Sequence, residues 1–341
     1  MHPLIPFYPV PVFEIPIPGF GTLPIHGFGL LVALGFIFGG NVAMERARKT
    51  GLDPEVINRL LSWLVVGTFI GGHVGYGLMY KPAEYFANPI EFLKVWQGLS
   101  SFGGFVVCVP LSFWFFRKEK LPIWPYMDSL AIGLGLGWFL GRMGCTVAHD
   151  HPGTPSDFWL AKYCRPVEGH TLVFPDWMME SAHQDFRWGP CAQVGAPITD
   201  IHNQLNLTGY SGVVSAHDMG FYEALWSLSV FFLFVVLDRW PRRPGFYVTL
   251  LGVLYAPVRF FMDYLRPVST DVRYLTDLIH PAGMDPRYYG LTPGQMWSVV
   301  FLVVSAYGLW KRIQTTDRPV GPTAPLTPEE GGHKTSASAA T

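Results

Sequence analysis

Charged residues are scarce in this sequence. They make up 14% of its 341 residues, whereas a soluble domain has about 25%, and this shortage argues against a water-exposed globule. The formal net charge is −1, so the chain lacks the basic surface that nucleic-acid binding needs. It also has only four cysteines, with no C-x-x-C pair among them, which excludes a disulfide scaffold, a zinc ribbon and a paired redox motif.

Long apolar stretches are abundant instead. A transmembrane helix needs about 20 mostly apolar residues, and seven such stretches are present. They lie near residues 27–44, 59–80, 99–116, 127–145, 219–237, 246–265 and 293–310. Residues 1–26 are Pro-rich and contain no Lys or Arg, so we expect neither a spanning helix nor a signal peptide there. The sequence predicts an all-α polytopic membrane protein with about seven transmembrane helices.

Positive charges alternate between the predicted loops. Lys and Arg are retained on the cytoplasmic side of a membrane, and their clusters follow the first, third, fifth and seventh stretches. These clusters lie at residues 46–49, 117–120, 239–243 and 311–312. We therefore expect the N-terminus outside and the C-terminus inside.

This orientation divides the chain into five parts. They are an external N-terminal segment (1–26), transmembrane helices one to four (27–145), an external domain inserted between helices four and five (146–218), helices five to seven (219–312) and a disordered cytoplasmic tail (313–341) rich in small and polar residues. In a bacterium the external domain lies in an oxidising compartment. Cys164 and Cys191 then either form a disulfide or remain thiols.

Polar and glycine residues gather at the outer ends of the predicted helices. Ionisable side chains inside a bilayer are costly and mark function or internal pairing, and the cytoplasmic halves are almost purely apolar. The residues at the outer ends are His73, Tyr76, Gly103, Gly104, Arg142, Glu223, Arg259, Asp263 and Arg266.

Two arginines and an aspartate share one face of the sixth predicted helix. Arg259 and Asp263 are four residues apart, and Arg266 follows three residues later, so one carboxylate can orient both guanidiniums. Arginine binds phosphate in bidentate fashion, and Arg142 adds a cation from another helix. The group is either an internal salt-bridge cluster or a phosphate pocket at headgroup depth. The neighbouring glycine-rich stretches either pack helices closely or border a lipid slot.

Several motifs resemble those of the bacterial prolipoprotein diacylglyceryl transferases, in the family's order, between about residues 20 and 312. GGHVGYGLMY resembles the second-span run G-G-R-x-G-Y-x-x-x-Y, and VWQGLSSFGGFVV resembles W-x-G-x-x-x-H-G-G. GRMGCTVAHDHPG is similar to the signature G-R-x-G-N-F-x-N-G-E-x-x-G. HDMGFYEAL resembles H-P-x-x-x-Y-E, and RFFMDYLR resembles R-x-x-x-E-x-x-R. IHGFGLLVALGF and LTPGQMWS are similar to the segments that open the first and last spans.

The resemblance implies an inner-membrane enzyme of lipoprotein maturation. Such enzymes move the diacylglyceryl group of phosphatidylglycerol onto the lipobox cysteine thiol of a preprolipoprotein and release glycerol phosphate. The implied partners are phosphatidylglycerol, the preprolipoprotein signal region and the bilayer, with no nucleic acid, metal or cofactor. The motif positions that carry over are Arg142, Gly144, Asp150, Gly153, Glu223, Arg259, Asp263 and Arg266.

The sequence departs from the family pattern where hydrogen-bonding groups are expected. Phe102 stands where the family has the His of H-G-G, so a candidate base for the substrate thiol is absent there. His149 or His151, which follow the signature helix, would replace it. The other departures are Phe28 for a Tyr, His73 for an Arg, and Cys145 and Ala148 for two Asn.

Two alternatives to an active transferase stay open. One is a homologue that binds phospholipid or lipoprotein without turnover, or that acts on an altered substrate. The other is an outer-face metalloenzyme, although the spacing of the external histidines matches no compact ligand motif. Those histidines are His149, His151, His170, His183, His202 and His217.

Overall fold

The computed structural model of the chain describes residues 4–6, 12–17, 21–80, 82–93, 100–148, 152–156, 158–164, 214–266 and 289–332. The chain forms two compact units. Unit 1 comprises Met1–Gly35, Trp138–Leu228 and Phe260–Asp285, and unit 2 comprises Phe36–Gly137, Ser229–Arg259 and Pro286–Thr341.

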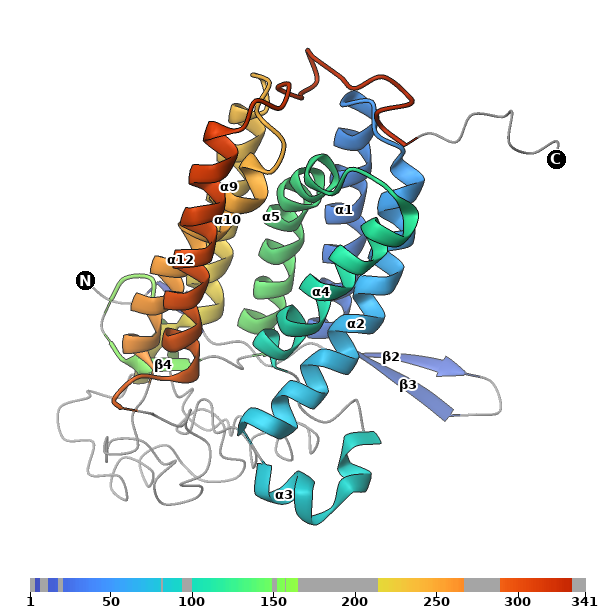
Figure 1. The fold of residues 1–341 in the computed structure, drawn as a ribbon. Helices are drawn as coiled ribbons and strands as arrows, with labels where there is room; N and C mark the ends of the chain where they lie inside the picture. Colours follow the sequence, from blue (N-terminus) through green and yellow to red (C-terminus); the bar gives the residue numbers. More distant parts are fainter. Residues whose placement is uncertain are drawn as a thin grey trace, which may run out of the picture. The chain divides into compact units, whose positions relative to one another are not determined.

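Most of the described residues lie in helices, as the sequence predicts (Figure 1). The long helices are α1 (Gly27–Lys49), α2 (Pro54–Tyr80), α4 (Ser101–Glu119), α5 (Ile123–Ala148), α9 (Met219–Leu237), α10 (Phe246–Met262) and α12 (Pro293–Gln314). The short helical segments are α3 (Pro82–Ala87), η1 (Pro89–Leu93) and η2 (Asp263–Leu265). The residues of α1, α5, α9 and α10 are divided between the two units.

In the described part of the chain, six helices are long and apolar enough to cross a membrane: α1, α2, α5, α9, α10 and α12. The remaining predicted span, near residues 99–116, forms α4, whose last turn carries Arg117 and Lys118. The apolar part of α4 is therefore shorter than the helix. The prediction of a multi-helix membrane protein is confirmed, with six helices rather than seven meeting the length and composition of a span.

Short strands in unit 1 depart from the all-α prediction. β1 (Ile5–Pro6), β5 (Lys162–Cys164), β6 (Val214–Asp218) and β4 (Pro152–Pro155) form a sheet in that order, and β2 (Val12–Ile17) pairs antiparallel with β3 (Gly21–His26). Proline excludes a helix from the N-terminal segment but is tolerated in edge strands, and a search for long apolar runs does not detect strands this short. Because β6 ends directly before α9, the sheet leads into the first turn of that helix.

Glycines bring α2 and α4 into close contact within unit 2 (Figure 1). A Cβ atom added at Gly75 would lie 2.4 Å from Gly103 Cα, and one added at Gly103 would lie 2.3 Å from Gly71 O. Neither position accepts a larger side chain unless a backbone moves. A Cβ atom at Gly104 would make ordinary contacts. Gly103 thus allows α2 and α4 to pack closely, as the first of the two alternatives for the glycine-rich stretches predicts.

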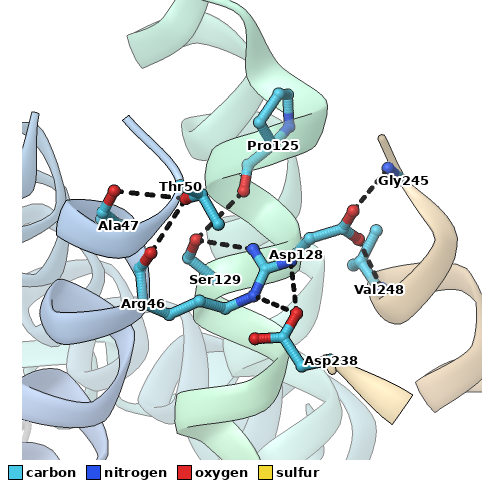
Figure 2. A network of polar contacts seen from close by, with 9 residues as sticks. All are labelled: Arg46, Ala47, Thr50, Pro125, Asp128, Ser129, Asp238, Gly245 and Val248. Atoms are coloured by element: carbon cyan, nitrogen blue, oxygen red, sulfur yellow. Dashed lines mark hydrogen bonds and ion pairs between the residues drawn. The ribbon is translucent and has the colours of Figure 1, made fainter. Parts of the chain in front are cut away.

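A buried ion pair joins α1 to the residue after α9 in unit 2 (Figure 2). Arg46 Nε donates to Asp238 Oδ1 at 3.1 Å, and Nη2 lies 3.0 Å from the same oxygen. Arg46 Nη1 donates to Ser129 Oγ on α5 at 3.0 Å. Arg46, which follows the first predicted span, is thus buried together with its counter-ion at the end of α1.

Asp128, the neighbour of Ser129, caps α10 from α5 (Figure 2). Its Oδ2 accepts from Gly245 N at 2.7 Å and its Oδ1 from Val248 N at 3.0 Å. Amides at a helix start have no partner within the helix, so a side chain from another helix satisfies them. The contact joins residues 117 positions apart, and no local motif indicates it.

Residues 315–332, for which the composition predicts disorder, contact other segments of unit 2. The Leu326 amide donates to Thr50 O at 2.9 Å, and the Tyr126 hydroxyl donates to Gly331 O at 2.7 Å. Val320 is buried, and Leu326 packs against the core of the unit. That core comprises Ala43, Ala47, Leu52, Val56, Ile57, Leu60, Phe115, Phe116 and Tyr126.

Candidate active site

Arg142 and Glu223 form a buried ion pair in unit 1. Arg142 lies on α5 and Glu223 on α9, and Arg142 Nε is 2.6 Å from Glu223 Oε2. The two side chains are 9% and 1% exposed. A buried charge is tolerated when it is paired and hydrogen-bonded. Sequence reasoning selected both residues from their depth in the predicted membrane, and the structure brings them into direct contact.

Two residues of α5 flank the Arg142 guanidinium. It lies 5.0 Å from the centroid of the Trp138 ring, within the range of a cation–π contact. Arg142 Nη1 is 3.9 Å from Cys145 Sγ, so a thiol lies where the family signature has an amide. A Cβ atom at Gly144 would lie 3.2 Å from the Phe28 ring and carbonyl. Of the departures from the family pattern, Cys145 thus lies on the signature helix α5, and Phe28 contacts it.

Lys162 connects α5 to the start of α9. Its Nζ lies 2.5 Å from Asp218 Oδ2 and donates to Thr146 O at 2.7 Å. Asp218 Oδ1 accepts from Phe221 N at 3.0 Å and from the Thr146 hydroxyl at 3.4 Å. Sequence reasoning singles out neither Lys162 nor Asp218. A single lysine in a predicted external loop belongs to no helical or strand pattern that would mark it. The one sequence feature that could have indicated this ion pair is Asp218, at the proline position of the H-P-x-x-x-Y-E motif.

α10 ends in the turn η2, which carries the predicted carboxylate. Arg266 Nε lies 2.9 Å from Asp263 Oδ1, and the Asp263 side chain is 0% exposed. The predicted pairing of this carboxylate with an arginine three residues later is thus present. Arg259, four residues before Asp263, is also buried. Arg259 belongs to unit 2, whereas Asp263 and Arg266 belong to unit 1.

Gly153, the last glycine of the signature, adjoins both β6 and η2. A Cβ atom there would lie 2.7 Å from His217 Cβ and 2.8 Å from Leu265 O, so glycine allows three segments of unit 1 to meet. His217 Nδ1 and the Tyr222 hydroxyl are 2.9 Å apart in a hydrogen bond. Burial lowers the pKa of His217, so its imidazole is neutral near neutral pH.

His73 and Tyr76 lie in unit 2, beside α3 and η1. His73 is fully buried, and because a carbonyl can only accept, its Nε2 donates to Glu91 O at 2.8 Å. The rings of His73 and Tyr76 lie 5.5 and 6.5 Å from the Tyr85 ring, between centroids. These two predicted site residues therefore meet around a tyrosine that sequence reasoning did not select.

Several predicted site residues lie outside the described residues: His149, Asp150, His151 and Cys191. The side chains of Phe102 and Cys164 are also outside the description. Of the histidines in the metalloenzyme alternative, the structure describes His217. The proposed base, the disulfide and the metal alternative thus stay predictions.

Comparison with known proteins agrees with the motif resemblance over most of the chain. A family model described as "Prolipoprotein diacylglyceryl transferase" matches residues 17–311. The phosphatidylglycerol–prolipoprotein diacylglyceryl transferase of Cereibacter sphaeroides is 27% identical over 301 residues, which cover 84% of this chain and 90% of the relative. Proteins of the same name are 28% identical over 247 residues in Chromohalobacter salexigens (72% and 76% covered) and 36% identical over 125 residues in Thermus thermophilus (36% and 44% covered).

The family match includes both halves of the candidate site. Arg142 on α5 and Glu223 on α9 lie within residues 17–311, as does the turn that holds Asp263 and Arg266. The chain belongs to the prolipoprotein diacylglyceryl transferase family.

Proposed function

We propose that this protein transfers the diacylglyceryl group of phosphatidylglycerol to the cysteine thiol of a prolipoprotein, and that the Arg142–Glu223 pair forms the phosphate end of its active site. Family membership supports the reaction. The observation that carries the site is the 2.6 Å ion pair, in which a buried carboxylate orients a guanidinium. An oriented guanidinium suits the planar, bidentate recognition of a phosphodiester.

The reaction couples one bond formed to one bond broken. The thiolate sulfur attacks the carbon of the diacylglyceryl group that bears the phosphate ester. A C–S thioether bond forms, and the C–O bond between that carbon and the phosphate breaks. Glycerol phosphate leaves with the electron pair of that bond. Negative charge grows on the departing oxygen, and donors already in place stabilise this charge in the transition state. The proposed donors are Arg142, Arg259 and Arg266.

The turn η2 is proposed to hold the lipid headgroup. Asp263 lies 2.9 Å from Arg266 Nε and is fully buried, so the carboxylate limits the rotamers of that arginine. Gly153 lets this turn approach β4 closely. Tyr76, His73 and the glycines Gly103, Gly104 and Gly144 are proposed to border the lipid path.

A histidine after α5 is the proposed proton acceptor. A cysteine thiol with its ordinary pKa of about 8.5 is mostly protonated near neutral pH, so a base speeds the attack. Phe102 cannot serve. His149 and His151 follow the helix that carries Arg142 by a few residues, and Asp150 between them provides a carboxylate.

The proposed location is the bacterial inner membrane, with the N-terminus and residues 146–218 periplasmic and the C-terminus cytoplasmic. The cation clusters support this orientation, because Arg48 and Lys49 at the end of α1 are exposed and α12 ends in Lys311 and Arg312. The periplasmic residues are proposed to form the external domain that receives the signal region of the prolipoprotein.

The second candidate function is binding of the same substrates without turnover. The thiol of Cys145, 3.9 Å from Arg142 Nη1, favours it because the family signature has a stronger hydrogen-bonding amide there. Phe102 also favours it, because this residue stands where the family has a histidine that could act as the base.

A transfer assay separates the two candidates. Purified protein is incubated with phosphatidylglycerol labelled in its acyl chains and a lipobox peptide, and a thioether-linked labelled peptide is expected. A peptide with Ser in place of the lipobox Cys is the matched substrate control. Binding of the lipid without labelled peptide, together with failure to rescue a transferase-depleted strain, would instead support the non-catalytic homologue.

A further inference from the structure

Lys162 and Asp218 form a second connection between α5 and α9, next to the Arg142–Glu223 pair. Thr146, which accepts from Lys162 Nζ at 2.7 Å, is four residues after Arg142 and shares its face of α5. Asp218 directly precedes α9, and Glu223 lies in the second turn of that helix. The two ion pairs are therefore successive connections between the same two helices of unit 1.

Lys162 contacts a helix terminus on each side. Thr146 O is among the last four carbonyls of α5, which have no partner within the helix and carry its partial negative charge. Asp218 accepts from Phe221 N at 3.0 Å and so caps the start of α9. One ammonium group thus neutralises a helix end and a capping carboxylate. At 2.7 Å and 2.5 Å, these contacts restrain α9 from sliding or rotating against α5.

Burial prevents water from replacing either partner of the Lys162–Asp218 ion pair. The side chains of Lys162 and Asp218 are 3% and 5% exposed, so water cannot take over the role of either partner. If the ammonium is removed, the carboxylate must take up a proton or move. Because Asp218 caps α9, such a change reaches the turn that carries Glu223.

The sequence motif points to the same pair. In HDMGFYE, Asp218 occupies the proline position of H-P-x-x-x-Y-E. A proline at a helix start sets φ and needs no partner, whereas a buried aspartate needs a cation. Lys162 lies on β5 opposite Ala216 of β6, two residues before Asp218, and supplies that cation.

We infer that Lys162 is a positioning residue for diacylglyceryl transfer: through Asp218 it holds the start of α9 so that Glu223 keeps the Arg142 guanidinium oriented toward the phosphate. The inference rests on the proposed function. Lys162 acts through α9 and does not itself contact the substrate.

A double-mutant cycle tests this role. Lys162→Met, Glu223→Gln and the double variant are assayed with phosphatidylglycerol and the lipobox peptide, at a temperature where all are equally folded. Lys162→Met is expected to lower kcat about tenfold or more, with a smaller change in KM, because misplacement of a catalytic group reduces the rate steeply. In the Glu223→Gln background the same change should lower kcat by less than about twofold, because the pathway through Glu223 is already broken.

Arg46→Met is the matched control. It breaks another buried ion pair, in unit 2, between Arg46 on α1 and Asp238 directly after α9, which lie 3.0 Å apart. We expect it to lower the melting temperature while kcat stays unchanged in both backgrounds. If Lys162→Met behaves like Arg46→Met, with a lower melting temperature and a wild-type kcat, the inference is overturned. Lys162 then has a purely structural role.

A measurement that needs no turnover separates this inference from the proposed function. If the wild-type protein transfers no label, the proposed function fails by itself. The alkylation rate of Cys145, followed by peptide mass spectrometry, then reports the position of the guanidinium 3.9 Å from its sulfur. Lys162→Met and Glu223→Gln should each change this rate about threefold or more in the same direction, because both displace the guanidinium that adjoins the sulfur. An unchanged rate in folded Lys162→Met protein would overturn the inference.

Discussion

The Arg142 guanidinium on α5 lies 2.6 Å from the Glu223 carboxylate on α9. Each group compensates the charge of the other in a site with little access to water. A variant that lacks one of them leaves its partner buried and unpaired, which destabilises the protein as well as the site. Activities of site variants therefore need to be compared at equal amounts of folded protein.

Arg142→Ala and Arg259→Ala are each expected to lower the transfer rate about 100-fold or more, because each removes a positioned donor to the departing phosphate. Both proteins should still accumulate in the membrane. The rate is measured with labelled phosphatidylglycerol, and accumulation by immunoblot. Wild-type transfer by either variant would show that its arginine does not bind the phosphate.

The double variant His149→Ala, His151→Ala is expected to lower transfer about tenfold or more near neutral pH. The loss should shrink as the assay pH rises towards about 8.5, the ordinary pKa of a cysteine thiol, because thiolate then forms without a base. Rate–pH profiles of both proteins test this. An unchanged rate and profile would assign proton transfer to another group.

The proposed orientation is tested with a reporter enzyme that is active only outside the cytoplasm. A fusion after residue 200 should be active, and a fusion after residue 245, in the loop between α9 and α10, should be inactive. The opposite pattern would reverse the topology and place the Arg142–Glu223 pair near the inner surface.

Arg46→Met is expected to lower the free energy of unfolding by about 3–5 kcal/mol, because it leaves Asp238 without its cation in a largely buried position. Arg48→Met is the control on the same helix. Its side chain is 58% exposed and pairs with an exposed Glu45, so a change within about 0.5 kcal/mol is expected. Denaturant unfolding in detergent measures both, and equal effects would contradict the role of burial.

His217 is expected to make stability depend on pH. Burial lowers the pKa of His217 in the folded protein, so the unfolded chain binds more protons below its own histidine pKa of about 6.5. Stability is therefore lost as the pH falls through that value. The melting temperature should drop between about pH 7.5 and about pH 5.5, and His217→Asn should reduce this drop. A drop of the same size in the variant would assign the pH dependence to other groups.

The long helices could be predicted because each contains about 20 apolar residues, a property of one continuous stretch. The pairing of Asp263 with Arg266 could also be predicted, since a spacing of three residues places both on one helical face. Arg142 and Glu223 were selectable separately, from the cost of a charge in a bilayer. Their direct contact depends on how α5 and α9 pack, which no local pattern specifies.

The contacts of Lys162 and Asp128 could not be predicted for a related reason. Asp128 caps α10 through Gly245, 117 residues later, and Lys162 is one cation among several in segments that look like loops. Each side chain has a structural role only because the folded chain brings a particular helix end beside it. The contacts of residues 315–332 could not be predicted from composition either, because they depend on two apolar side chains and a few hydrogen bonds within a segment that is mostly polar.

The hydrogen bonds from residues 315–332 have a consequence for the order of assembly. The Tyr126 hydroxyl bonds to Gly331, 205 residues later, and Thr50 O accepts from the Leu326 amide. The ribosome therefore completes every described helix before it makes Leu326 and Gly331. Thr50 and Tyr126 can bond to Arg46, Ala47 and Asp53 from the start, but their bonds to residues 315–332 form only after α12 has been synthesised. The packing between α1, α2 and α5 is thus completed by the segment of the described chain that is made last.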